Sequence, residues 1–238
     1  MHIYRCEVQL MENLFFASRE VNNFFQTEAV IGNYALAYAL GLCRAGYHND
    51  SEITYAQDLE KLNEAGIYVT PGTLTEKARF TVTRFNALSD SYWYQMEQNA
   101  ISVDRERIFN PRLKARATNF PQIGRLKLLS IGNKGVFYIT SRNEFRVPRY
   151  IRLGKFMSKA KISAYKQNYR EIRAQDVSYR NYLNPNDLPS DTQIGMFDLL
   201  NIRPTPLIRQ VQLSGDFYEL ADVDKTLLPA GMQFYTDF

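Results

Sequence analysis

The chain has 238 residues, of which 45% are hydrophobic and 23% charged, the composition of an ordinary soluble globular protein with a full hydrophobic core. The formal net charge of +4 hides a segregation, because residues 79–185 hold 21 of the 29 basic residues and only 7 of the 25 acidic ones. Such a concentrated positive field favours a polyanionic partner, and the sequence has neither an 18-residue apolar run nor a basic amphipathic helix that would favour a membrane.

The start of the chain lacks the basic n-region and apolar h-region of a signal peptide, so we expect a cytoplasmic protein. Its two cysteines, Cys6 and Cys43, lie in apolar stretches. We therefore expect them to be small buried hydrophobic residues and not part of a disulfide framework or a metal site.

The first elements follow from hydrophobic periodicity. Residues 3–10 alternate between apolar and polar side chains, which predicts a half-buried strand. Residues 28–45 are apolar on nearly all sides and precede Gly46, which predicts a buried helix packed on a sheet. A second helix is predicted over residues 55–65, closed by Gly66.

From Arg79 onward the sequence is typical of short strands separated by turns. The predicted strands are 79–85, 91–97, 125–131, 136–140, 145–153, 159–165, 208–213 and 217–220, with residues 132–135 as a hairpin connection. A strand, then helices, then many strands predicts an α+β fold with an antiparallel sheet. We expect one elaborated domain over residues 1–238, with a basic strand-rich insertion around residues 79–185.

Basic and aromatic side chains alternate at strand spacing within this segment. Alternation places Arg146, Tyr150 and Arg152 on one face of a strand, and Lys159, Lys161, Ser163 and Tyr165 on one face of the next. Such faces offer charges to phosphates and aromatic planes to bases, as single-stranded RNA binding requires. The alternative interpretation is a solvated sheet surface whose lysines merely keep the chain soluble.

A second basic run spans residues 105–116 in a predicted long loop or extended hairpin. A loop this basic can wrap a nucleic-acid backbone. The alternative is a solvated insertion, against which Ile108, Phe109 and Leu113 argue, because they give the loop apolar surface to bury.

Catalytic signals are sparse. The sequence has two histidines, His2 and His48, and none of the common phosphate-loop, zinc-protease, paired-cysteine or nucleophile-elbow motifs. We therefore expect no cofactor, no metal and no catalytic residue.

The N-terminal part of the chain carries a more specific pattern. It consists of Met-His-Ile-Tyr-Arg-Cys-Glu at residues 1–7, Asn-Leu-Phe-Phe-Ala-Ser-Arg-Glu at 13–20, and Asn-Tyr-Ala-Leu-Ala-Tyr-Ala-Leu-Gly-Leu at 33–42. This pattern resembles the small backbone subunit of type I-D CRISPR Cascade complexes, the Csc-one branch of the Cas-five family. The match is most specific over about residues 1–45, and the chain length and basic middle also fit.

The resemblance implies a modified RNA-recognition-motif fold, ferredoxin-like at its core, with an inserted basic β-hairpin or thumb. The implied role is antiviral defence as a non-catalytic subunit that holds the 5′ handle of the CRISPR RNA. Implied partners are Cas-seven-type backbone subunits, a Cas-ten-type large subunit and target duplex DNA next to the PAM, while a separate Cas-six-type nuclease cuts the precursor RNA. Because the aromatic signature of ordinary RNA-recognition motifs is absent, we expect binding through loops and phosphates more than through stacking.

The candidate RNA-binding residues combine the basic middle segment with two residues of the matching stretch. For those two, Arg19 and Tyr34, the match leaves open whether they contact RNA or shape the subunit. The full set is Arg19, Tyr34, Arg107, Arg112, Lys114, Arg116, Arg125, Lys127, Lys134, Arg142, Arg146, Arg149, Arg152, Lys155, Lys159 and Lys161.

Two other functions remain open on the sequence. One is a metal-independent endoribonuclease that processes CRISPR precursor RNA, using His2 or His48 with a tyrosine or lysine. The other is a structural protein whose basic face meets an acidic protein or a duplex DNA backbone.

Overall fold

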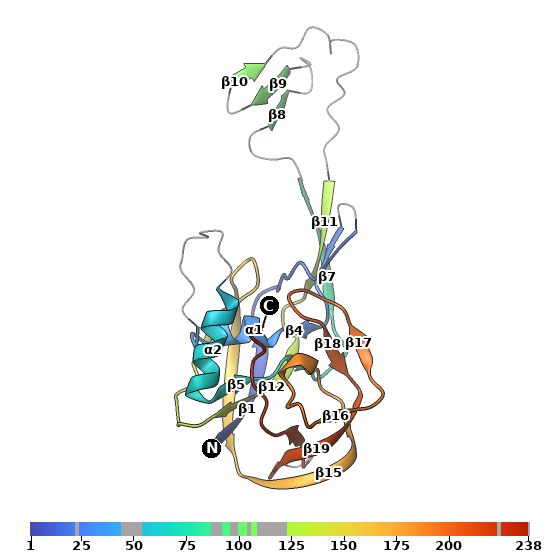
Figure 1. The fold of residues 1–238 in the computed structure, drawn as a ribbon. Coiled ribbons are helices and arrows are strands. Elements are labelled where there is room, and N and C mark those ends of the chain that lie inside the picture. Colours follow the sequence, from blue (N-terminus) through green and yellow to red (C-terminus); the bar gives the residue numbers. More distant parts are fainter. Residues whose placement is uncertain are drawn as a thin grey trace.

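The fold is α+β and mostly β. The computed structural model describes residues 1–21, 24–43, 54–86, 92–95, 100–103, 106–108, 123–222 and 225–237. Figure 1 shows α1 (Asn33–Ala39) and α2 (Tyr55–Ala65) on one side of a large sheet, with a smaller sheet on the other side. All described strand pairs are antiparallel except one, which agrees with the predicted antiparallel architecture.

The large sheet has seven strands, with the predicted first strand at its centre. The order is β13 (Tyr150–Leu153), β14 (Ser158–Gln167), β1 (His2–Leu10), β12 (Lys134–Ser141), β6 (Gly72–Leu74) and β4 (Val30–Ile31), and β5 (Ile67–Val69) also pairs with β12. Every residue of β12 after Lys134 is buried, because the helices cover one face of this strand and the smaller sheet covers the other.

Both predicted helices form, but the first is shorter than expected. Residues 28–45 do not make one helix: Val30 and Ile31 form β4, and α1 spans only Asn33–Ala39. Gly32, with φ −60° and ψ 144°, holds extended backbone immediately before α1, and Gly41, at φ +74°, follows it. Helix α2 ends as predicted at Gly66, which adopts the left-handed conformation (φ 66°) that glycine tolerates.

The smaller sheet and a neighbouring strand pair come from the C-terminal third. The sheet contains β15 (Tyr169–Tyr179), β19 (Val211–Leu220), β16 (Gln193–Ile194) and β20 (Leu227–Pro229), and the pair is β17 (Asp198–Leu200) with β18 (Leu207–Arg209). Tyr138 of β12 and Tyr179 of β15 are both buried, as expected where the two sheets pack.

A four-stranded sheet extends from the other end of the molecule. It contains β2 (Arg19–Val21), β3 (Phe24–Gln26), β11 (Ile123–Leu129) and β7 (Phe80–Asn86), and the chain between β7 and β11 includes β8 (Tyr92–Gln95), β9 (Ala100–Val103) and β10 (Glu106–Ile108). The hairpin predicted at residues 132–135 is wrong, because β11 pairs with β7 and β3 whereas β12 belongs to the seven-stranded sheet. The turn, with Gly132 at φ +81°, therefore carries the chain from one sheet to the other.

The strand predicted over residues 145–153 is also shorter, since β13 begins at Tyr150. Pro148 explains the difference, because proline has no N–H to donate to a strand ladder. The adjacent Arg149 carbonyl nevertheless accepts a hydrogen bond from the Ile162 amide at 2.8 Å, which fixes the loop against β14.

The cysteines lie in the hydrophobic core as expected. Cys6 and Cys43 are buried free thiols, and burial raises the pKa of Cys6 to about 12 and that of Cys43 to about 11. Both thiols therefore stay protonated and act as packing groups. Separately, none of the helices in the described ranges is long and apolar enough to cross a membrane.

Candidate nucleic-acid interface

One face of the seven-stranded sheet carries basic and tyrosine side chains at its β13 and β14 edge. Arg152 lies opposite Lys159 and Tyr150 opposite Lys161, and across β1 the row continues from Lys161 to Lys134 through Gln9. Residues paired in register point to the same side of a sheet. One surface, here named the basic sheet face, is therefore shared by Lys134, Tyr150, Arg152, Lys159 and Lys161. The predicted alternation of β13 and β14 is confirmed, because Ile151 and Ala160 between these residues are buried.

Exposed tyrosine rings are part of this face. Tyr150 is 46% exposed, with Lys159 Nζ 4.7 Å and Arg149 Cζ 5.8 Å from its ring centroid. Tyr165, 51% exposed, lies on the same side of β14, four residues beyond Lys161 and hence about 13 Å along the strand. The face thus combines cationic groups with aromatic planes that solvent can reach.

A second basic surface lies on the four-stranded sheet. Arg84 of β7 is opposite Arg125 of β11, while Lys127 of β11 and Arg19 of β2 both align with Gln26 of β3. Arg19, Arg84, Arg125 and Lys127 consequently share one face, here named the β11 face. Three of these residues were candidates from the sequence, but Arg84 was missed although it lies in the strand predicted over residues 79–85.

The two faces contain like charges in direct opposition. Arg84 opposes Arg125 and Arg152 opposes Lys159, an arrangement that is unfavourable in the absence of an anion. Glu12 partly offsets the second pair, since its Oε2 lies 3.4 Å from Arg152 Nη1. Within the described ranges, Arg84 and Arg125 have no acidic side chain at ion-pair distance.

The remaining basic candidates divide by their partners. Arg19 pairs with Glu28, with 2.7 Å between Nε and Oε1, so it is the one β11-face candidate whose charge is compensated in the described chain. Lys127 Nζ lies 4.1 Å from the centroid of the Phe80 ring. Candidates without an acidic partner among the described residues are Arg125, Lys127, Lys134, Arg142, Arg146, Arg149, Lys155, Lys159 and Lys161.

Four candidates cannot be placed as side chains. Arg112, Lys114 and Arg116 lie outside the described residues, and Arg107 lies in β10, a strand described through its backbone only. Their proposed role in RNA binding stays a prediction from the sequence.

Tyr34 does not belong to either basic face, and its burial favours the second of the two roles left open for it, that of shaping the subunit. It is 3% exposed in α1, and its hydroxyl accepts a hydrogen bond from Asn184 Nδ2 at 3.2 Å. Burial raises the pKa of this tyrosine well above its usual range. The N-terminal match placed Tyr34 beside other apolar residues, and the structure uses it to pack the core.

A buried carboxyl group, absent from the sequence candidates, lies close to Tyr34. Asp187 is 2% exposed; its Oδ2 accepts from Asn33 Nδ2 at 2.6 Å and from the Tyr68 hydroxyl at 2.9 Å, and its Oδ1 accepts from the Tyr235 amide at 2.9 Å. Burial raises the pKa of Asp187 to about 7, although the hydrogen bonds lower it. The group ties α1 and β5 to the C-terminal segment.

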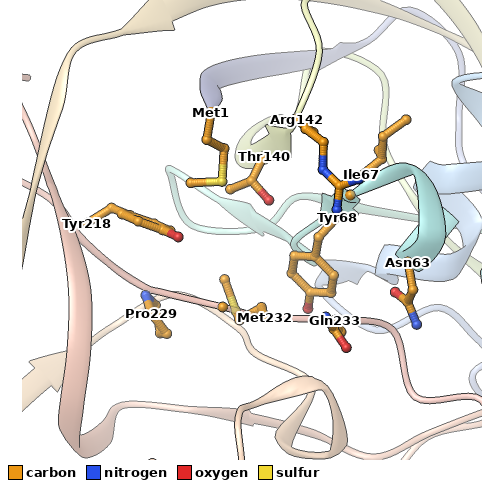
Figure 2. A pocket seen from close by; sticks show the side chains of 12 residues that line it. Met1, Asn63, Ile67, Tyr68, Thr140, Arg142, Tyr218, Pro229, Met232 and Gln233 are labelled. Atoms are coloured by element: carbon orange, nitrogen blue, oxygen red, sulfur yellow. The ribbon is translucent and has the colours of Figure 1, made fainter.

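A cavity of about 260 Å³ opens between the start of β1, the end of α2, and the segment after β20. Figure 2 shows Arg142 and Thr140 on one side of this cavity, with Tyr218, Pro229 and Met232 facing them. A Cβ built on Gly66 would lie 3.0 Å from Arg142 Cβ, so the arginine stem rests directly on the glycine. The cavity therefore has walls of mixed apolar and polar character and one guanidinium group.

The two histidines considered as catalytic candidates do not lie together in the described part of the chain. His2 is half-buried at the start of β1, and His48 lies outside the described residues. Over the described ranges, no cluster of three or more histidine, cysteine, aspartate or glutamate side chains has the geometry to hold a metal ion.

Comparisons with known proteins complement this geometry. No curated protein matches the chain. Among solved structures, a chain of the "Cryo-EM structure of the Type III-B Cmr-beta bound to cognate target RNA and AMPPnP, state 1" is similar at 13% identity and a TM-score of 0.40, covering 89% of this chain and 86% of that one. That likeness is too slight to support a structural argument.

The family comparison is more extensive. The family described as "Type I-D CRISPR-associated protein Cas5/Csc1" matches residues 1–237, which confirms the resemblance found in the N-terminal sequence. The chain accordingly belongs to the type I-D Cas5/Csc1 family of CRISPR-associated proteins and is a CRISPR effector subunit.

Proposed function

We propose that this subunit is a non-catalytic RNA-binding protein, which holds the 5′ handle of the CRISPR RNA on the basic sheet face and the β11 face. The observation that carries the proposal is the Arg84–Arg125 pair, two opposed guanidinium groups with no acidic partner in the described chain. A phosphate between them would offset their repulsion and accept charge-assisted hydrogen bonds from both.

Single-stranded RNA fits the basic sheet face better than a duplex. Tyr150 exposes its aromatic ring next to Lys159 and Lys161, and Tyr165 exposes a second ring farther along the same face. Unpaired bases stack on such rings. The bases of a duplex are already stacked on one another and offer only their edges. A polyanion with free bases therefore uses both the charges and the rings of this face.

For the core, we propose the modified RNA-recognition-motif, or ferredoxin-like, arrangement. The strand order β14-β1-β12-β5 supports it, because all three neighbouring pairs are antiparallel and helices connect β1 to β5. In a β-α-β-β-α-β unit a second helix would join β12 to β14. In this chain a loop and β13 occupy that connection, so the unit is modified on that side.

The acidic C-terminal part is the proposed contact for neighbouring effector subunits, of the Cas-seven and Cas-ten types. Residues 186–238 contain 8 acidic and 3 basic residues, which disfavours RNA and suits a protein with a basic surface. Four large apolar side chains are exposed in one short segment: Ile194 (40%), Met196 (77%), Phe197 (44%) and Leu199 (61%). Such a concentration on edge strands is typical of a protein interface.

The RNA-binding role is tested with the purified chain and repeat-derived RNA in the presence of a chelator. We expect a complex with intact RNA, and weaker binding for Arg84→Ala. The matched control is Arg173→Ala, which removes an exposed arginine that pairs with Asp216 on the smaller sheet and should bind RNA like the wild type. A metal-free cleavage product that is lost in His2→Ala or in His48→Ala would instead favour the endoribonuclease.

A further inference from the structure

The cavity lies at one end of the basic sheet face. Thr140 in the cavity wall is opposite Ile3 of β1, and Ile3 is opposite Gln167 of β14. Gln167 points to the same side of β14 as Lys161, six residues away, or about 20 Å along the strand. Beyond Tyr165, β14 therefore runs toward the end of the sheet at which the cavity lies, separated from Thr140 by the buried Ile3.

The chemistry of the walls suits a planar group with hydrogen-bond acceptors. Ile67, Pro229 and Met232 supply apolar surface. The side chain of Arg142 adds a cation, and it has no acidic partner in the part of the chain that the structure describes. Arg142 is exposed to solvent, so its guanidinium group is accessible to a ligand that carries hydrogen-bond acceptors.

Two further features limit what fits. The volume of about 260 Å³ corresponds to about nine water molecules at liquid density, enough for one nucleobase with part of its sugar. Burial raises the pKa of Tyr218 above its ordinary value, so its hydroxyl stays protonated and neutral beside the ligand. Among the residues that line the cavity, Arg142 is the one with a charged side chain.

We infer that the cavity takes one unstacked base of the RNA bound on the basic sheet face, with Arg142 bonding the acceptor edge of that base. Guanine fits best, because its O6 and N7 together accept from one guanidinium group. This inference rests on the proposed function: the phosphates hold the RNA on the sheet, and the cavity reads one base at its end.

The test combines single abasic sites along the 5′ handle RNA with Arg142→Ala. At one guanine position, we expect the abasic site to weaken binding by about tenfold to a hundredfold. Arg142→Ala should cause a loss of similar size, and the two changes together should cost little more than either alone. Thr140→Met, which extends a side chain into the cavity and keeps the arginine, should reproduce the effect.

Two variants serve as controls. Arg146→Ala removes a charge from the same loop but not from the cavity wall, and Lys161→Ala removes one from the sheet. Each variant should lower the affinity for RNA by the same factor whether or not the RNA carries the abasic site. Thermal melting checks that Arg142→Ala and Thr140→Met remain folded, and Arg142→Lys, which keeps the charge but loses the bidentate geometry, provides a milder substitute.

The outcomes separate the two proposals. One outcome is that the chain binds RNA while Arg142→Ala lowers the affinity by the same factor for every abasic position. In that case the base pocket is wrong and the RNA-binding function stands. If the chain binds no RNA, the proposed function and the pocket both fail.

Discussion

At Arg84 and Arg125, the arrangement that favours RNA binding lowers the stability of the free protein. Two exposed guanidinium groups face each other across β7 and β11, and in the described chain no acidic group compensates them. The free protein keeps a repulsion that a bound phosphate would relieve. The pair is therefore more informative than a simple count of positive residues.

Arg125→Glu should change stability and affinity in opposite directions. The new carboxylate would face Arg84, so we expect the free energy of unfolding to rise by about 0.5 kcal/mol. Affinity for single-stranded RNA should fall at least tenfold, because one contact becomes repulsive. Urea unfolding and an RNA titration measure the two effects, and a parallel loss of stability and affinity would contradict this explanation.

Asp187 makes stability depend on pH. Its carboxyl has a pKa of about 7 in the folded chain against 3.8 ordinarily, so the folded state holds a proton that the unfolded state releases. Its stabilising contribution is thus complete below pH 4 and is lost as the pH rises to about 7.

The Asp187→Asn variant tests this directly, because an amide does not titrate. From pH 4 to pH 7.5, the unfolding free energy of the variant minus that of the wild type should increase by about 3–4 kcal/mol. Urea unfolding of both proteins across that range gives the difference. A difference that is constant with pH would mean that the carboxyl does not titrate between the two states.

Among the elements, the turn between β13 and β14 depends on one glycine. Gly154 has φ +69°, and a Cβ added there would lie 2.4 Å from the carbonyl oxygen of Phe15. The same oxygen accepts a hydrogen bond from the Lys155 amide at 2.9 Å, which anchors the turn next to the basic sheet face.

Gly154→Ala should therefore destabilise the chain by about 2–4 kcal/mol, since backbone strain and a clash with a backbone atom add. Gly41→Ala is the matched control: Gly41 has φ +74° but no atom within 4 Å of an added Cβ. It should cost only about 1 kcal/mol. Thermal unfolding compares the stability of the two variants. Equal losses of stability would show that the chain relieves the clash at Phe15 without an energetic cost.

Strands with regular alternation were predictable from the sequence, whereas irregular ones were not. Residues 3–10 and 159–165 alternate without a break and form β1 and β14. The longest strand, β15, was missed because a bulge between Ala174 and Val177 interrupts its alternation, with Asp176 at φ 53°. A local pattern cannot anticipate such a shift.

The same limit applies to the candidate site. Alternation sufficed to place Lys159 and Lys161 on one face, since both lie in one strand. The β11 face instead requires β2 and β3 to align with a strand about 100 residues later, through the parallel pairing of β3 with β11. Local sequence therefore supplied the charges on that face, and only the fold supplied Arg84 as the neighbour of Arg125.

At the scale of the whole molecule, the charge segregation follows the fold. The basic middle segment supplies most of both basic faces, while the acidic C-terminal part contributes β16, β19 and β20 of the smaller sheet and the exposed apolar segment at residues 194–199. The fourth strand of the smaller sheet, β15, belongs to the basic segment. RNA and protein partners can then bind to separate surfaces of one subunit.

A double substitution, Met196→Asp with Leu199→Asp, tests this separation. Both side chains are largely exposed, so we expect stability and RNA affinity to change less than twofold in equilibrium constant. Co-expression with the other effector subunits should yield less assembled complex, because the interface would then bury two charges. Unchanged assembly would exclude this segment from the interface.

The salt dependence of RNA binding tests the central claim, that the basic faces bind RNA phosphates. Six phosphate contacts to a single strand predict a slope of about −4 for log K against log salt concentration, or a loss of roughly 300-fold between 50 and 200 mM. Arg125→Glu should make the slope shallower. A slope near zero for the wild-type chain would contradict the claim.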